Sequence, residues 1–224
     1  MSRVTFAALL SLRGPAVVLT VGAAVLLSGC QGPATPSGSP SETGSTTASP
    51  TVSVSVPAAS ATSSSSGAYK PADAQGKAQN VPVPVMPELA KENSKAGLEA
   101  FIGYWYATYS YATETGDLGP WSLSTDTTTE SGAAYKKAID ANYASGCWLV
   151  GGRISVPRIE VLWQPGAGSQ VAKVQVIQEE IRYLGANSTV RQRASEASNT
   201  AEAVKASFRN GAWQVIDNGL ILGS

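Results

Sequence analysis

The sequence contains no histidine, only two cysteines and few charged residues. Without histidine the chain cannot form a Ser-His-Asp triad, a Cys-His pair, a His-ligated zinc or haem site, or a histidine pH switch. The 16 basic and 16 acidic residues cancel, which argues against nucleic acid as a partner because phosphate binding needs clustered Lys and Arg. Charged residues make up 14% of the chain, against roughly 25% in an ordinary soluble domain. We therefore expect segments of low charge beside a single folded domain.

The first such segment is residues 1–29, which are typical of an export signal. Arg3 and Arg13 are its only charged residues, and residues 15–27 are almost wholly apolar. That apolar core is shorter than the roughly 20 residues that span a bilayer as a helix, but it suits the hydrophobic region of a signal peptide. Removal of residues 1–29 would leave a net charge of −2.

The signal ends on Leu27, Ser28, Gly29 and Cys30, a motif that resembles the bacterial lipoprotein box. The resemblance implies that Cys30 receives a diacylglycerol thioether, with acyl chains such as palmitate, and becomes the first residue after cleavage. Two acyl chains anchor a protein stably to a membrane. We therefore expect the chain on the outer face of the cytoplasmic membrane; the alternatives are a plain secretory signal or an uncleaved anchor.

The second segment of low charge is the region 30–68. Residues 31–68 contain 12 Ser, 6 Thr and 5 Pro, one charged residue and no aromatic residue. Such a chain cannot bury enough apolar surface to offset its loss of conformational entropy, so it predicts a disordered linker. Residues 69–86 regain charge and end in alternating prolines, which favour an extended approach to the folded domain at 87–224.

Hydrophobic spacing predicts two helices at the start of that domain. The first begins near residue 87 or 93–94 and ends at Thr115, with Gly116 as its C-cap. The second covers residues 130–143, and a turn containing Gly119, Pro120 and Trp121 separates the two.

After Gly146 the hydrophobic period changes to two, which predicts strands. Residues 147–163 are predicted to form one long strand with a bulge near Pro157, and 171–184 form a second. Residues 200–209 and 212–217 are predicted to form a hairpin across Asn210 and Gly211. The fold class that follows is α+β: two N-terminal helices packed on one curved antiparallel sheet of four or so strands.

This order of elements resembles the cone-shaped fold of the nuclear-transport-factor-2-like superfamily. In more detail, residues 69–224 resemble a domain family of unknown function that recurs in actinobacterial lipoproteins. The resemblance is carried by the Pro-rich segment 83–87, the segment 96–101 with Tyr104 and Trp105, the step 115–117, and the segment 145–148 before Gly151 and Gly152. A pair of cysteines often follows the first helix in that family, but residues 124–131 contain none. The resemblance implies no known activity.

Candidate binding residues are aromatic and cationic. Aromatic side chains crowd the first helix over more than one face, so some belong to the core and others are candidates for a groove that binds a sugar, peptide or lipid. Charged residues on two strands form ion pairs or line a cavity. The candidate binding surface comprises Tyr104, Tyr106, Tyr109, Trp121, Arg153 and Arg182.

No catalytic residue emerges from the sequence. Residues 1–224 contain no phosphate-binding loop, metal-ligand spacing or nucleophile elbow, so we expect no cofactor and no metal. Cys147 is either a reactive thiol or, as its neighbour Trp148 favours, a small buried hydrophobe.

Three functions follow from these observations. The first is a membrane-anchored domain that binds a small molecule or an envelope protein. The second is an enzyme of the cone superfamily with a carboxylate or Tyr as acid or base, which the absence of histidine disfavours. The third is a cell-envelope spacer without a ligand. The oligomeric state and the identity of the ligand stay open.

Overall fold

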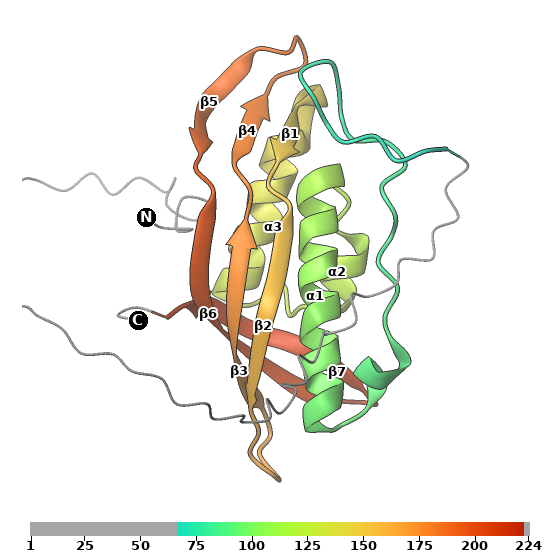
Figure 1. Ribbon diagram of the computed structural model, residues 1–224, viewed down its shortest axis with the longest axis vertical. Helices are drawn as coiled ribbons and strands as arrows, with labels where there is room; N and C mark the ends of the chain where they lie inside the picture. Colours follow the sequence, from blue (N-terminus) through green and yellow to red (C-terminus); the bar gives the residue numbers. More distant parts are fainter. Residues whose placement is uncertain (1–66, 222–224) are drawn as a thin grey trace, which may run out of the picture. The chain divides into compact units, whose positions relative to one another are not determined.

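A computed structural model describes residues 67–221 of the chain (Figure 1). The predicted signal peptide, Cys30 with its lipobox and nearly all of the predicted linker lie outside the described residues. Within residues 67–221, no helix is long and apolar enough to cross a membrane.

The longest helix, α1 (Lys95–Thr115), has its ends fixed by local chemistry. The hydroxyl of Ser94 accepts a hydrogen bond from the amide of Gly97, which satisfies one of the free donors in the first turn. Gly116 ends the helix in the left-handed conformation, with φ of 80°. Of the two predicted starts the one at 93–94 is confirmed and the one near residue 87 is wrong, and the predicted end at 115 is confirmed. A short 3₁₀ turn, η2 (Glu88–Lys91), precedes α1.

Two further α-helices follow α1. The predicted turn around Trp121 is wrong, because Gly119–Leu123 form one helical turn, α2, with proline in its first turn. Helix α3 (Glu130–Tyr143) has the predicted bounds and is capped by the hydroxyl of Thr129. The 3₁₀ turn η3 (Ala144–Gly146) leads into the strands.

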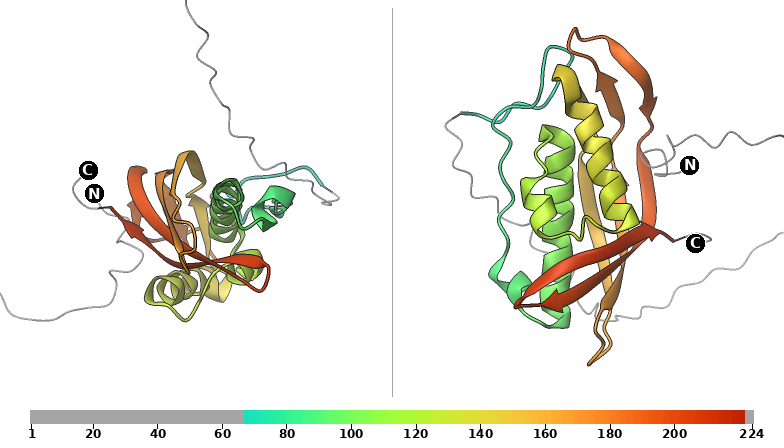
Figure 2. Two further views of the ribbon diagram at one scale, coloured as in Figure 1. Left: turned by 90° about the horizontal axis from the view of Figure 1, so that it is seen from below. Right: turned by 180° about the vertical axis from the view of Figure 1, so that it is seen from behind.

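Within residues 67–221, seven strands form two antiparallel sheets. The order of the three-stranded sheet is β1 (Trp148–Gly151), β4 (Ile181–Leu184) and β5 (Val190–Ser195). The order of the four-stranded sheet is β2 (Ile154–Leu162), β3 (Gln170–Gln178), β6 (Ser198–Arg209) and β7 (Ala212–Leu220). Figures 1 and 2 show α1 lying alongside β2, and α3 and α2 on the same side of the strands.

The predicted fold class is therefore wrong. The sequence predicts a cone made of two helices on a single curved sheet of four or so strands. The part of the chain that the structure describes instead has three α-helices and seven strands in two sheets. The physical reason is that each long predicted strand breaks in two. Gly151 and Gly152 take φ of 79° and 78°, which ends β1 before β2, and Glu179 and Glu180 separate β3 from β4.

The breaks lie beside one another. Flanking residues pair across them: Gly151 with Ile181, and Ile154 with Gln178. The amide of Gly152 donates to the carbonyl of Glu180 over 2.9 Å. We call this level, where β1 passes into β2, β3 into β4 and β5 into β6, the bend.

Two local predictions for the strands are confirmed. The register of β2 against β3 shifts between Ser155 and Arg158, on either side of Pro157. β6 and β7 form a hairpin in which Asn210 and Gly211 take φ of 51° and 79°, the conformation that a two-residue hairpin turn requires.

The main core lies between α1, α3 and the inner faces of the strands. Its fully buried large side chains are Leu98, Phe101, Ile102, Trp105, Tyr106, Trp121, Ile139, Leu149, Val174, Val176, Ile181 and Val204. A smaller, separate cluster consists of Trp148, Val150 and Leu184, and Ala72 and Tyr143 pack against it. The polypeptide around residue 72 thus belongs to the folded body.

Candidate functional site

The predicted aromatic residues on α1 and α2 lie in the interior. Tyr106 and Trp121 are 1% exposed and Tyr104 is 8% exposed, whereas Tyr109 is half-buried. The ring of Tyr109 stacks on Tyr135 of α3 with 3.8 Å between centroids, and Trp121 meets Tyr135 edge-on at 4.7 Å. The structure therefore brings these residues together as packing between helices, and not as an open groove.

A carboxylate lies among these aromatic rings. Glu202 on β6 is 4% exposed, and its Oε2 accepts a hydrogen bond of 2.7 Å from the hydroxyl of Tyr106. It sits opposite Val174 of β3 on the core side of the sheet. Burial of an ion costs several kcal/mol unless hydrogen bonds compensate, so the hydrogen bond from Tyr106 offsets part of the cost of burying Glu202.

Tyr106 and Glu202 are residue types that can act as an acid or a base, but a substrate has no access to them. A substrate has to come within hydrogen-bond distance of the group that exchanges its proton. Tyr106 and Glu202 are both sealed from solvent. Their geometry is that of a structural contact between α1 and β6.

Arg153, a predicted binding residue, lies at the bend and is engaged by the chain's own residues. Its guanidinium donates to the hydroxyl of Tyr69, lies 3.6 Å from a carboxylate oxygen of Glu114, and stands over the Tyr69 ring at 5.3 Å. The Tyr69 hydroxyl in turn donates to Glu114. Burial, followed by the Glu114 carboxylate, raises the pKa of Tyr69 to about 12. We call these three residues the latch.

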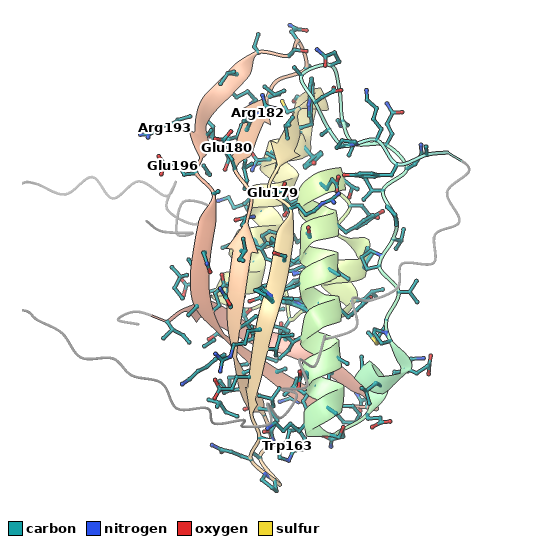
Figure 3. All side chains as sticks on the ribbon, in the orientation of Figure 1. Trp163, Glu179, Glu180, Arg182, Arg193 and Glu196 are labelled. Carbon is teal, nitrogen blue, oxygen red and sulfur yellow. The ribbon has the colours of Figure 1, made fainter. Side chains whose placement is uncertain are left out.

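Arg182, the other cationic candidate, is exposed on β4. Figure 3 shows it near the bend together with Glu179, Glu180, Arg193 and Glu196, whereas Trp163 lies at the other end of the strands. Arg193 and Glu196 form an ion pair of 3.3 Å. Because β5 is the outer strand of its sheet, this charged region borders a sheet edge that no other strand covers within residues 67–221.

Comparison with known proteins identifies the domain. Residues 67–219 match a family of unknown function (DUF6318). The chain belongs to the DUF6318 family. The match confirms the predicted domain of unknown function, and it spans nearly all the described residues of this DUF6318 domain. No curated protein matches the chain.

Several solved structures are similar to the DUF6318 chain at low identity. The intermembrane space region of the chloroplast protein ARC6 is 9% identical, with a TM-score of 0.42, over 59% of this chain and 99% of that one. An uncharacterized protein with a cystatin-like fold from Caulobacter vibrioides is 16% identical, with a TM-score of 0.35, over 52% and 83%. A SEC-C motif containing protein from Rhodopseudomonas palustris is 17% identical, with a TM-score of 0.31, over 59% and 85%.

Cys147 is buried in the DUF6318 domain, as expected of a small hydrophobe beside Trp148. Residues 67–221 contain no group of three or more acidic or Cys residues placed to hold a metal ion.

Sequence reasoning missed Glu202, Tyr69 and Glu114. For Glu202 a signal was present: Thr200, Glu202, Val204 and Ala206 share one phase of a predicted strand, so a carboxylate occupies an inward position. For Tyr69 and Glu114 no sequence signal exists, because they lie 45 positions apart and meet only when the chain folds back over the end of α1.

Proposed function

We propose that this DUF6318 protein is a lipid-anchored, extracytoplasmic domain that binds a protein partner at the cell envelope. The proposed anchor is a diacylglyceryl group on Cys30. Support comes from the short apolar segment before the lipobox, from the Ser/Thr/Pro composition of residues 31–68, and from the family match, which begins only at residue 67. The linker that this composition predicts would have a root-mean-square span of roughly 35 Å, which would let the domain reach partners beside the membrane.

The single observation that carries the binding proposal is the exposed charged region at the bend. Arg182, Arg193 and three glutamates stand beside the edge strand β5, whose residues Val190–Arg193 are exposed. Charges of both signs fix the register of a protein partner and speed its encounter. A drug-sized molecule would instead need a concave, mostly apolar pocket, and the aromatic residues available for one are packed inside.

The anchor is tested by replacing Cys30 with Ser in the full chain and measuring its distribution between membrane and soluble fractions. The proposal predicts that the wild type sediments with membranes and that Cys30→Ser is released. Equal membrane partitioning of the two proteins would refute the anchor.

The binding surface is tested by charge reversal. Arg182→Glu is compared with Lys137→Glu, a control at an exposed position on α3, in cells treated with a cross-linker. We expect Arg182→Glu to lose the cross-linked species that wild type and Lys137→Glu retain. If all three proteins give the same cross-links, the partner binds elsewhere and the binding surface is not at the bend. If none of them gives a cross-link, the binding proposal is refuted and the spacer function is favoured.

A further inference from the structure

Residues 67–80, which we call the strap, lie between the predicted linker and the rest of the domain. The strap folds back on itself: Lys70 and Gln79 exchange backbone hydrogen bonds of 3.0 and 2.9 Å, and the amide of Asp73 donates to the carbonyl of Gly76. The Asp73 carboxylate accepts from the amides of Gln75 and Gly76. Figure 1 shows this segment at the end of the domain where α3, β1 and the β4–β5 connection meet.

The strap covers the smaller apolar cluster. The indole of Trp148 donates to the carbonyl of Asp73 over 2.9 Å, and Ala72 packs against the cluster of Trp148, Val150 and Leu184. The ammonium of Lys77 stands 5.5 Å above the Tyr143 ring. Tyr143 packs against both this cluster and the main core, but no residue of the strap belongs to the main core. Opening of the strap therefore leaves the packing of α1 against the strands in place.

The latch secures the strap at the side of the linker. Tyr69 is two residues from the start of the described chain and bonds to Glu114 of α1 and Arg153 at the bend. Tyr69 is 38% exposed, so solvent competes for these contacts. A segment that buries little apolar surface and is held by exposed polar contacts opens at a lower free energy than the global one.

We propose that the strap is a separately opening element, held by the Tyr69–Glu114–Arg153 latch, through which the linker controls exposure of the Trp148 cluster. In the closed state the cluster is covered. When the latch breaks, the strap leaves as an extension of the linker and Trp148, Val150 and Leu184 become accessible. The physiological use of this opening rests on the proposed anchor, because an anchored linker transmits tension to residue 67, whereas the opening itself can be measured on the unanchored chain.

Hydrogen–deuterium exchange of the full-length Cys30→Ser chain tests the proposal. Tyr69→Phe removes the hydroxyl from the latch and keeps the ring beneath Arg153. Tyr111→Phe is the matched control, because its hydroxyl donates to Asp117 over 3.2 Å at the end of α1 and not to a residue of the strap or the latch. We expect Tyr69→Phe to raise exchange of the hydrogen-bonded amides of the strap about tenfold, the factor that corresponds to a hydrogen-bond contribution of about 1.4 kcal/mol.

Exchange in β3 and β6 reports global unfolding and separates the outcomes. The proposal requires that Tyr69→Phe leaves β3 and β6 unchanged and that Tyr111→Phe leaves the strap unchanged. It is overturned if the strap of the wild type exchanges as slowly as β3 and β6, or if Tyr69→Phe accelerates all segments equally. It is also overturned if Tyr69→Phe changes no segment. None of these results depends on Cys30 being lipidated.

Discussion

The buried contact between Tyr106 and Glu202 leads to a quantitative prediction. Tyr106→Phe removes the hydroxyl that donates to the Glu202 carboxylate over 2.7 Å. Hydrogen bonds to charged groups contribute about 1.5–3 kcal/mol, and the loss is at its largest when the charge stays buried. Glu202 is 4% exposed, so we expect Tyr106→Phe to lower the free energy of unfolding by about 2 kcal/mol.

The pairwise part of this effect is isolated by a double-mutant cycle. Glu202→Leu removes the carboxylate and fills its space with apolar atoms. Replacing both members of a buried polar pair by apolar groups costs less than the sum of the single changes, so the double variant should be more stable than additivity predicts by about 2 kcal/mol.

Urea denaturation followed by tryptophan fluorescence gives the four unfolding free energies by linear extrapolation. Tyr104→Phe, on the same helix, supplies the control cycle with Glu202→Leu and should be additive. If the losses of unfolding free energy in the Tyr106→Phe and Glu202→Leu variants add within about 0.5 kcal/mol, the two side chains are not coupled. The hydrogen bond between them would then not stabilise the core.

Three further predictions concern other elements. Gly116→Ala should destabilise the domain by about 2 kcal/mol, because the residue has φ of 80° and the new methyl would lie 2.5 Å from the Tyr143 ring; an unchanged melting temperature would contradict this. Tyr69 has a folded-state pKa of about 12, above its ordinary 10.0, so its contribution to stability is complete below pH 10 and is lost as the pH rises toward 12. The difference in tyrosinate absorbance between wild type and Tyr69→Phe should accordingly have its titration midpoint near pH 12. A midpoint at pH 10 would disprove the latch geometry. Ile139→Ala, at a fully buried position of α3, should cost about 2–5 kcal/mol in urea denaturation, and a loss below about 1 kcal/mol would show that α3 is not part of the core.

Features set by neighbouring residues in the chain could be predicted from the sequence. Ser94 and Gly116 end α1 through hydrogen bonds and dihedral angles that involve residues within four positions. Asn210 and Gly211 form the hairpin turn because both tolerate positive φ. The same holds for α3, whose cap and apolar spacing are contained in its own residues.

Features set by residues far apart in the sequence could not be predicted. Gly151 and Gly152 interrupt the first predicted strand without showing that it ends there, and the second predicted strand runs on through Glu179 and Glu180. The sequence therefore predicts each pair of strands as one, and the predicted number of sheets is wrong. The aromatic spacing on α1 is compatible with either a core or a groove, and only the packing of Tyr135 from α3 against Tyr109 decides for the core.

The proposed function depends on a lipid anchor at Cys30 that would hold this domain at the membrane. Mass spectrometry of the N-terminal peptide of the protein purified from membranes tests it most directly. We expect a chain that begins at Cys30 and carries a diacylglycerol thioether on its sulfur. A peptide that continues from Gly29 into an unmodified Cys30 would contradict it.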